Sequence, residues 1–437
     1  MKSYMSKNIS FFTYIKLGII IAAAGVGAGD LNSSAFVGIK LGTAVLWAVV
    51  IGALLKYILN EGIIRYQTAT GKTWLEGVLQ DKYLRNPAII IFGFYLIIWS
   101  FLVAAALISA CGIVMYSIWP IFDNVNYDYL YNSDNGALYD KILYGSLFSI
   151  VAVLIVKYGK FKIFENIMSI CAIIMLIVIP LIALQLYDNW HEALKGILIW
   201  KIPNISKNGI EWTFALLGGV GGTLTIISSS YWMLQEGIKD INKCRKGLFF
   251  GYVVIALFGI AVILIASATN DAIPGDIKGI KLISAITLVI GQELGSIWKV
   301  AFFICVLLAV FSSLLAVWQS APLIFTNYYN MVFKKSKKET MDVKKEINNP
   351  VYRYYLYMIA TLPIFMTIAK FEYIQKIYAI FGALFIPLLS ITLIILNNKS
   401  NLLNKKMCNK PLTTFILIVI LLLSSIAGYF ALKPIFK

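Results

Sequence analysis

The chain has very little of what most enzyme sites are built from. It holds one histidine, His191, and five cysteines, and only 14% of its 437 residues are charged. No HExxH or GxSxG pattern occurs, and no cysteine spacing matches a metal site. An odd cysteine count, with no cysteine in a predicted external segment, argues against structural disulfides. We therefore expect a protein that is not an enzyme and needs no cofactor.

Apolar sequence is present in excess. Hydrophobic residues make up 60% of the chain and the mean hydropathy is +0.81, which is typical of a polytopic membrane protein. The first apolar run follows a basic start but has no small-residue cleavage site, so we expect it to be retained rather than removed as a signal peptide. Eleven membrane spans are predicted, at 14–37, 43–65, 88–118, 142–157, 165–187, 210–235, 247–268, 296–328, 353–369, 374–396 and 411–432.

The formal net charge of +17 follows the membrane topology rather than a nucleic-acid partner. The basic stretches 157–162, 239–246 and 334–339 fall on one predicted side, and the acidic stretch 123–140 falls on the other. This is the positive-inside pattern. We predict a multi-pass protein of the cell membrane with a cytoplasmic N-terminus and an external C-terminus. Its expected partners are the bilayer and a small substrate, with no nucleic acid and no obligate protein partner.

The first predicted span is interrupted in its middle. Residues 25–34 read GVGAGDLNSS, so that Gly25, Gly27 and Gly29 lead to Asp30. Each glycine weakens a helix by about 1 kcal/mol relative to alanine, and an aspartate at membrane depth costs about 2.5–3.5 kcal/mol. The pattern predicts a helix that breaks midway across the membrane and turns its freed backbone and one carboxylate toward a polar ligand. Broken helices of this kind form the binding sites of secondary transporters.

The sixth predicted span has a similar glycine-rich interruption. Residues 216–232 hold four glycines within five positions, followed by Thr225 and three consecutive serines. The two breaks are five spans apart, and because five is odd the second unit must be inverted relative to the first. We predict one transport domain over 1–437, made of five-span repeats at 14–187 and 210–396 and an additional span at 411–432. Two breaks in inverted halves favour alternating access over a continuous pore.

Other polar side chains lie in the second and eighth spans. Lys56 needs a counter-charge, for which Asp30 and Glu61 are the candidates. Two interpretations stay open: Lys56 makes a structural contact, or it takes part in coupling or gating. The serines of the eighth span either face the first span or bond back to their own helix. The candidates for coupling or gating are Lys56, Asn60, Glu61, Ser313 and Gln319.

Three stretches resemble a known family. They are AAAGVGAGDLNSSAFVGIKLGTAVLWAVV and YQTATGKTWLEG within residues 17–77, and GGVGGTLTIISSSYW in the sixth span. These are similar to the Nramp family of proton-coupled divalent-metal transporters. The resemblance implies an all-α fold of the leucine-transporter type, with two inverted five-span repeats. It also implies a metal that binds between the broken first and sixth spans.

The same comparison shows departures from the family's ligand motifs. The family has Asp-Pro-Gly-Asn in the first span, where this chain has Gly27, Ala28, Gly29 and Asp30. It has Met-Pro-His in the sixth span, where this chain has Thr225, Ile226 and Ile227. The first carboxylate ligand, the thioether and the histidine are therefore missing, and the amide ligand is replaced by the carboxylate of Asp30.

The remaining groups are oxygen donors, which suit a hard cation such as Mg²⁺ better than Mn²⁺ or Fe²⁺. We predict a divalent-cation transporter with Asp30 and Thr225 as metal ligands, and coupling to protons through Asp30, Lys56 or Glu61 is left open. The alternative is an amino-acid or other small-zwitterion transporter of the wider amino acid–polyamine–organocation superfamily, with the substrate carboxylate on backbone N–H groups. The predicted substrate-binding residues are Gly27, Asp30, Gly222, Thr225 and Ser228.

Overall fold

The computed structural model describes residues 11–122, 135–203, 209–238, 240–273, 280–334, 342–369 and 371–432. All regular elements among these residues are helices. Most of the acidic stretch 123–140 and of the basic stretch 334–339 lies outside the described residues. The long helices are α3 (Leu46–Thr70), α5 (Arg85–Ile118), α6 (Asn135–Tyr158), α7 (Phe161–Leu186), α11 (Ile241–Ala268), α13 (Ser296–Val332), α15 (Pro350–Met366), α16 (Phe371–Asn397) and α17 (Pro411–Leu432).

The predicted first and sixth spans are each divided into two helices. The first consists of α1 (Phe11–Gly25) and α2 (Ala28–Leu41), and the sixth consists of α9 (Gly209–Gly219) and α10 (Leu224–Glu236). Both predicted breaks are therefore confirmed. Every other predicted span coincides with one of the long helices. Eight helical stretches among the described residues are long and apolar enough to cross a membrane, which supports a multi-pass membrane protein.

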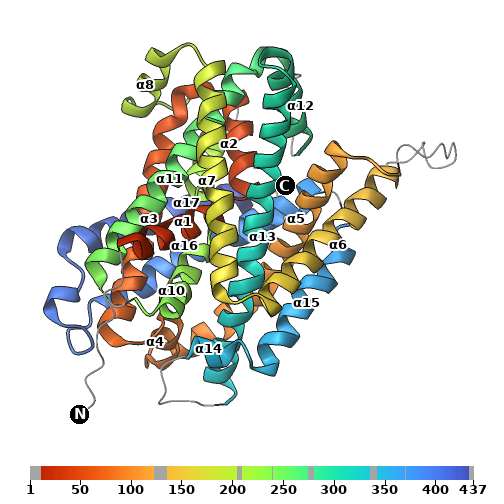
Figure 1. Cartoon of the computed structure of the whole chain (residues 1–437). Helices are drawn as coiled ribbons and strands as arrows, with labels where there is room; N and C mark the ends of the chain where they lie inside the picture. Colours follow the sequence, from red (N-terminus) through yellow and green to blue (C-terminus); the bar gives the residue numbers. More distant parts are fainter. Residues whose placement is uncertain are drawn as a thin grey trace.

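Short helices mark the two ends of the molecule, as Figure 1 shows. One end, here called the α8 end, carries α8 (Trp190–Leu198) and α12 (Ile280–Glu293). The opposite end, here called the α4 end, carries α4 (Trp74–Gln80) and α14 (Val343–Glu346). The remaining short elements are the 3₁₀ helices η1 (Gly42–Val45), η3 (Asn270–Ala272) and η4 (Lys405–Met407). Helices α7 and α13 run between these two ends (Figure 1).

Helix starts are defined by local capping. Thr73 and Glu76 form a capping box at α4, because the Thr73 hydroxyl accepts from the Glu76 N–H and the Glu76 carboxylate accepts from the Thr73 N–H. Asn189 caps α8 and Asp240 caps α11 in the same sense. These side chains satisfy N–H groups that the first helical turn leaves unpaired, so the helices begin at defined residues.

The helix that leads into the first break is held by close backbone contacts. Gly18 of α1 lies so near α11 that a Cβ on it would approach the Gly247 carbonyl oxygen to 2.2 Å. Gly251 of α11 is similarly close to the Gly18 carbonyl. Small residues allow membrane helices to pack backbone to backbone. This contact fixes α1, and therefore the position of the break that follows it.

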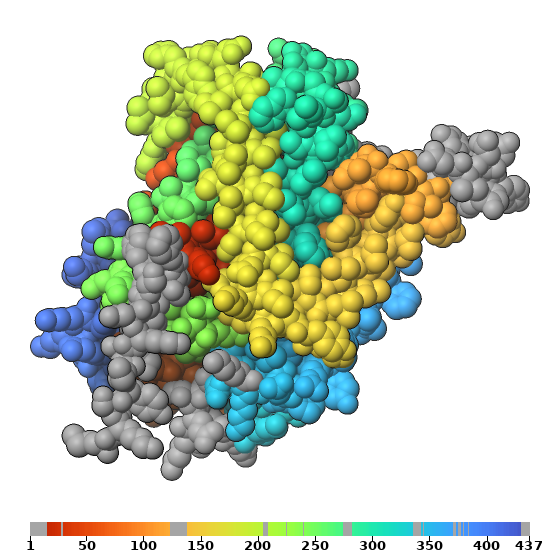
Figure 2. All heavy atoms as spheres, viewed as in Figure 1, coloured from red at the N-terminus to blue at the C-terminus, as the bar shows by residue number. Residues whose placement is uncertain are grey.

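One face of the molecule exposes a row of large apolar side chains. Figure 2 shows α7 running along the visible face from the α8 end toward the α4 end, with α13 beside it. The large apolar side chains exposed on α7 are Ile163, Ile170, Ile173, Ile177, Leu181 and Leu184. A membrane helix exposes such a row only where lipid covers it.

Candidate transport site

The carboxylate of Asp30 connects the two breaks. Asp30 is the third residue of α2, and its Oδ2 accepts a hydrogen bond of 3.3 Å from the Gly27 N–H just before that helix. Its Oδ1 accepts a bond of 2.8 Å from the Gly221 N–H in the other break. Both donors are N–H groups freed by the interruption of a helix, and the N-terminus of α2 adds a favourable dipole. An aspartate of the first repeat is thus bound to the second repeat.

Lys56 of α3 binds carbonyl groups of the second break, whereas Asp30 binds an N–H group there. Its Nζ donates to the Gly222 carbonyl at 2.7 Å and to the Gly219 carbonyl at 3.3 Å. Gly219 is the last residue of α9, so the ammonium lies at the negative end of that helix dipole. Lys56 is only 3% exposed. Its direct partners are therefore backbone carbonyls, and Asp30 attracts it across the site.

The second break requires glycine for conformational reasons. Gly221 and Gly222 have φ angles of +80° and +63°, in the left-handed region that other residues rarely adopt. This turn directs the Gly221 N–H toward Asp30 and the Gly222 carbonyl toward Lys56. The two consecutive glycines thus present a donor and an acceptor to opposite charges.

The first break is satisfied by hydroxyl groups of α13. Ser312 donates to the Ala23 carbonyl at 2.8 Å, and Ser313 donates to the Ala24 and Val26 carbonyls at 3.3 Å each. Ser312 also bonds back to Ala309 of its own helix. The interpretation in which these serines face the first span holds for both, and bonding within α13 applies to Ser312 as well.

Some predicted residues lie beside this centre and others lie farther along the helices. Thr225 lies in the first turn of α10, with its Oγ1 2.8 Å from where a Cβ on Gly222 would be. Asn60, one turn after Lys56, accepts from Ser229 at 2.6 Å and donates to Tyr252 at 3.2 Å. It therefore joins α3 to α10 and α11.

Gln319 contacts the end of α10, and Ser228 lies within that helix. Gln319 accepts from the Trp232 Nε1 at 2.6 Å and donates to Gln235 at 3.0 Å, near the end of α10. Ser228 is buried within α10, one turn beyond Thr225. The structure groups Gly27, Asp30, Lys56, Gly222 and Thr225 at the two breaks, and it places Gln319 in a contact between α10 and α13.

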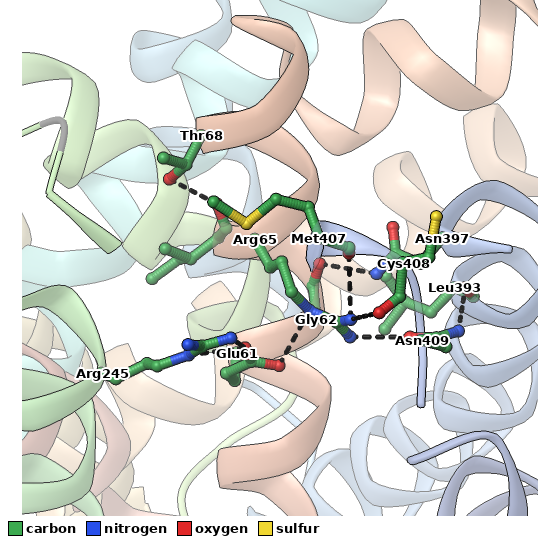
Figure 3. Close-up of polar contacts among 11 residues, drawn as sticks. Glu61, Gly62, Arg65, Thr68, Arg245, Leu393, Asn397, Met407, Cys408 and Asn409 are labelled. Atoms are coloured by element: carbon green, nitrogen blue, oxygen red, sulfur yellow. Dashed lines mark hydrogen bonds and ion pairs between the residues drawn. The ribbon is translucent and has the colours of Figure 1, made fainter. Parts of the chain in front are cut away.

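Glu61 is not the partner of Lys56 that the sequence suggested. Figure 3 shows its carboxylate between two arginines. Its Oε1 accepts from Arg245 at 2.7 and 2.9 Å, and its Oε2 lies 3.2 Å from Arg65 Nε. The physical reason is helix geometry, because Glu61 lies five residues after Lys56 and so faces α11 farther toward the α4 end. Its charge is already matched there.

Two residues that the sequence analysis did not single out complete this picture. Arg65 also donates to the carbonyls of Met407 and Cys408 and to the Asn409 side chain, which ties α3 to the connection between α16 and α17 (Figure 3). Tyr378 of α16 lies beside the first break, since a Cβ on Gly29 would be 3.7 Å from its ring. An arginine near the end of a span was a detectable signal, whereas one tyrosine among 25 was not.

The charges and donors define what this centre can hold. It offers one carboxylate, one ammonium, the Thr225 hydroxyl and backbone groups at the ends of broken helices. Among the described residues, no group of three or more His, Cys, Asp or Glu side chains is positioned to enclose a metal ion. The single histidine, His191, is exposed on α8. A ligand at this centre therefore meets a small number of oxygen atoms rather than a complete cage.

Comparisons with solved structures define the fold. The manganese transporter of Eremococcus coleocola, in a histidine-to-alanine mutant, superposes with a TM-score of 0.71 at 12% identity, over 98% of this chain and 89% of that one. The same transporter in complex with an aromatic bis-isothiourea substituted compound gives 0.62 at 14% identity, over 100% and 90%. MhsT in complex with L-phenylalanine gives 0.60 at 15% identity, over 99% of each chain. The fold is therefore that of leucine-transporter-type proteins, as predicted.

Sequence comparison identifies the family. No curated protein sequence matches the chain. The model of the Nramp family, described as natural resistance-associated macrophage protein-like, matches residues 18–433. This is a family of transporters and not of enzymes, which confirms the expectation drawn from the missing catalytic motifs. Because the match spans nearly the whole chain, including both broken spans, this protein belongs to the Nramp family.

Proposed function

We propose that this protein is a secondary transporter that carries a hard divalent cation, with Mg²⁺ favoured over Mn²⁺ and Fe²⁺, by alternating access. One observation carries the proposal: the Asp30 carboxylate is held between two broken helices by the N–H groups of Gly27 and Gly221. A carboxylate at the junction of two inverted repeats is placed where a cation can be bound from either side as the repeats tilt. Membership of a divalent-metal transporter family supports the substrate class.

The choice of a hard ion follows from the donor set. Asp30, Thr225 and nearby carbonyls supply oxygen only, and we assign Asp30 and Thr225 as the metal ligands. Mg²⁺ keeps several of its waters and is usually bound through one or two carboxylates rather than by an all-protein cage. A softer ion such as Mn²⁺ or Fe²⁺ gains more from nitrogen or sulfur ligands. A site with one carboxylate suits the partly hydrated ion.

Lys56 favours a hydrated cation over a dehydrated one. Its ammonium already holds the Gly219 and Gly222 carbonyls, which would otherwise coordinate a cation. Its charge also repels a cation that approaches Asp30 closely. Water molecules retained by the ion would fill the missing coordination positions and screen this repulsion.

The membrane arrangement is part of the proposal. We infer five-span repeats at 14–187 and 210–396, an additional span at 411–432, a cytoplasmic N-terminus and an external C-terminus. The substrate would bind among Gly27, Asp30, Gly222 and Thr225, and Ser228 would follow one helical turn farther along. Coupling to protons is the proposed driving force. Because Glu61 already forms ion pairs with two arginines, Asp30 and Lys56 are the stronger candidates for the coupling groups.

Uptake by reconstituted protein tests this function. Proteoliposomes loaded with a Mg²⁺-sensitive dye should show saturable uptake that Asp30→Asn abolishes, because the amide cannot neutralise the ion. Asp188→Asn is the matched control, since Asp188 is an exposed carboxylate before α8. A pH dye in the same vesicles reports proton movement. Wild-type uptake by Asp30→Asn would remove this carboxylate from the mechanism.

One observation favours a second candidate, a small zwitterion such as an amino acid. Lys56 gives the centre a positive charge that opposes a divalent cation, whereas a zwitterion brings no net charge. Its amino group would pair with Asp30 and its carboxylate with freed N–H groups. A thermal-shift panel of Mg²⁺, Mn²⁺, Ca²⁺ and the amino acids separates the two, because a ligand that binds only the folded state raises its stability.

A further inference from the structure

Helix α8 exposes an apolar stripe outside the membrane-spanning bundle. Trp190, Leu194 and Leu198 follow one another at intervals of four residues and are 41%, 58% and 75% exposed. At 3.6 residues per turn these side chains fall within an arc of about 80°. A surface helix of a soluble protein buries its apolar side chains against the core. An apolar stripe that faces outward therefore requires a partner that covers it.

The other two faces of α8 are already accounted for. Ala193 and Gly196 are buried against η1, and a Cβ on Gly196 would be 1.9 Å from the Thr43 carbonyl oxygen. Glu192 and Lys195 form an exposed ion pair of 3.0 Å on a third face. The helix is therefore seated firmly on one side and polar on another, and the apolar stripe lies between them.

The stripe continues the lipid-facing surface of α7. Leu181 and Leu184 are 42% and 59% exposed near the end of that helix, and α8 follows after a short turn. Figure 1 shows α8 extending sideways from the bundle at the end of α7. Along the chain, the exposed apolar residues at the end of α7 are therefore followed, after the turn at 187–189, by those of α8.

A second continuation follows α3. Val50 and Leu54 are exposed on the outer face of α3, whereas Trp47, one turn earlier, is buried. Trp200, just after α8, stacks on Trp47 with ring centroids 5.4 Å apart, and the Trp47 Nε1 donates to the Lys201 carbonyl. Tryptophans at the ends of membrane helices lie at the level of the lipid headgroups.

We propose that α8 is an interfacial helix whose stripe of Trp190, Leu194 and Leu198 inserts into the membrane leaflet at the α8 end. The partner is the bilayer itself, because the stripe follows the exposed apolar residues of α7 along the chain and the stacked tryptophans join the end of α8 to α3. The ion pair of Glu192 and Lys195 then faces water, as the polar side of an interfacial helix does. The contact with η1 links this anchor to the connection between α2 and α3, and so to one half of the broken first span. The inference does not depend on which substrate is carried.

Site-directed labelling in nanodiscs tests the orientation. The full chain carries Cys408→Ser, since the other four cysteines are buried. Leu194→Cys or Leu198→Cys is then labelled with the environment-sensitive dye NBD. Lys195→Cys is the matched control, because it is the neighbour of Leu194 and points about 100° away around the helix. Quenching by lipids with a doxyl group near the headgroup is measured for each.

The labels at 194 and 198 should emit at shorter wavelength and be quenched several-fold more strongly than the label at 195. Two positions are used so that one poorly tolerated substitution does not decide the result. Equal weak quenching at all three positions would overturn the proposal, because the stripe would then face water. A short-wavelength emission at 194 and 198 without quenching would overturn it as well, since a second protein copy would then cover the stripe.

Discussion

The two helix breaks have the same architecture and opposite chemistry. At the first break the freed carbonyls of Ala23, Ala24 and Val26 accept from neutral serine hydroxyls. At the second break the freed carbonyls of Gly219 and Gly222 accept from the Lys56 ammonium. The carbonyls of the first break therefore need no charged donor, whereas those of the second break depend on a buried cation.

This difference shows that an inverted repeat does not repeat its chemistry. Asp30 contributes to both breaks, because it accepts from Gly27 in one and from Gly221 in the other. Its charge is balanced by Lys56, which binds only the second break. Both charges thus bind the second break, and we expect it to be the more sensitive of the two to substitution.

The largest effect is expected for Lys56→Met. This change leaves the Gly219 and Gly222 carbonyls without their donor and Asp30 without its counter-charge. Removing one partner of a buried charge pair costs about 3–5 kcal/mol. Thermal unfolding of the purified protein should show a large fall in the midpoint temperature. Adding Asp30→Asn to Lys56→Met should recover part of this loss, because the two charges interact.

The matched control for this change is Lys246→Met, which removes an exposed lysine at the start of α11. It should leave the midpoint nearly unchanged. If Lys56→Met is no more destabilising than this control, the ammonium does not stabilise the second break and the two breaks are equivalent.

A smaller effect is expected from glycine substitutions, and it should differ between the breaks. Gly222→Ala places a side chain in the left-handed region, which costs about 1–2 kcal/mol, and its Cβ would lie 2.8 Å from Thr225 Oγ1. Gly27 has an ordinary φ of −119°, and a Cβ there would meet the Ser313 side chain, with its Oγ at 2.7 Å and its Cβ at 3.3 Å. Gly27→Ala should therefore destabilise less in the same thermal unfolding assay.

The reason for each effect can be tested separately. Ser313→Ala should relieve the crowding in Gly27→Ala and leave Gly222→Ala unchanged. Gly29→Ala is the control, because its Cβ would meet nothing nearer than 3.7 Å. Equal losses for Gly27→Ala and Gly222→Ala would show that steric crowding, and not the left-handed backbone, dominates at both breaks.

The neutral contacts of the first break should each contribute about 1 kcal/mol, the usual net value of one hydrogen bond. Ser313→Ala removes the donor to two carbonyls and should lower the unfolding midpoint modestly. Ser424→Ala is its matched control, because Ser424 of α17 bonds to carbonyls of its own helix. A loss in Ser313→Ala as large as that in Lys56→Met would contradict the distinction between the two breaks.

The sequence was sufficient to predict the helices and both breaks. A membrane helix must satisfy its own backbone hydrogen bonds, so a long run of apolar residues predicts one. Clustered glycines beside Asp30 predict where a helix breaks. The inversion followed from counting spans. These predictions depend on local composition, which a sequence displays directly.

Side-chain partners could not be predicted in the same way. Lys56 was expected to pair with Asp30 or Glu61, and its direct partners are the carbonyls of Gly219 and Gly222. Every residue has a backbone carbonyl, so the sequence does not indicate which carbonyls Lys56 binds. The arginines that bind Glu61 lie on the same helix and on α11, and only the packing of α3 against α11 brings them together.

The smallest effect is expected where a similar charge pair lies outside the membrane. Asp81, in the turn between α4 and α5, accepts from the Tyr83 and Leu84 N–H groups and from Lys399. Burial pushes the pKa of Asp81 upward, but the hydrogen bond from Lys399 and those from the two N–H groups outweigh it, so that the pKa is lowered. Because the folded state favours the ionised carboxylate, its contribution to stability is present above the unfolded pKa of about 3.9 and is lost as the pH falls through the folded value.

Asp81→Asn should therefore destabilise the protein at pH 7 by about 0.5–1 kcal/mol, since its partner Lys399 is partly exposed to water, which weakens the pair. The difference from the wild type should shrink as the pH is lowered below about 4, because the wild-type carboxyl is then protonated as well. Thermal unfolding of both proteins across this pH range measures the effect. A pH-independent difference would show that Asp81 acts through packing alone. A loss at pH 7 equal to that of Lys56→Met would show that depth in the membrane does not control the strength of these charge contacts.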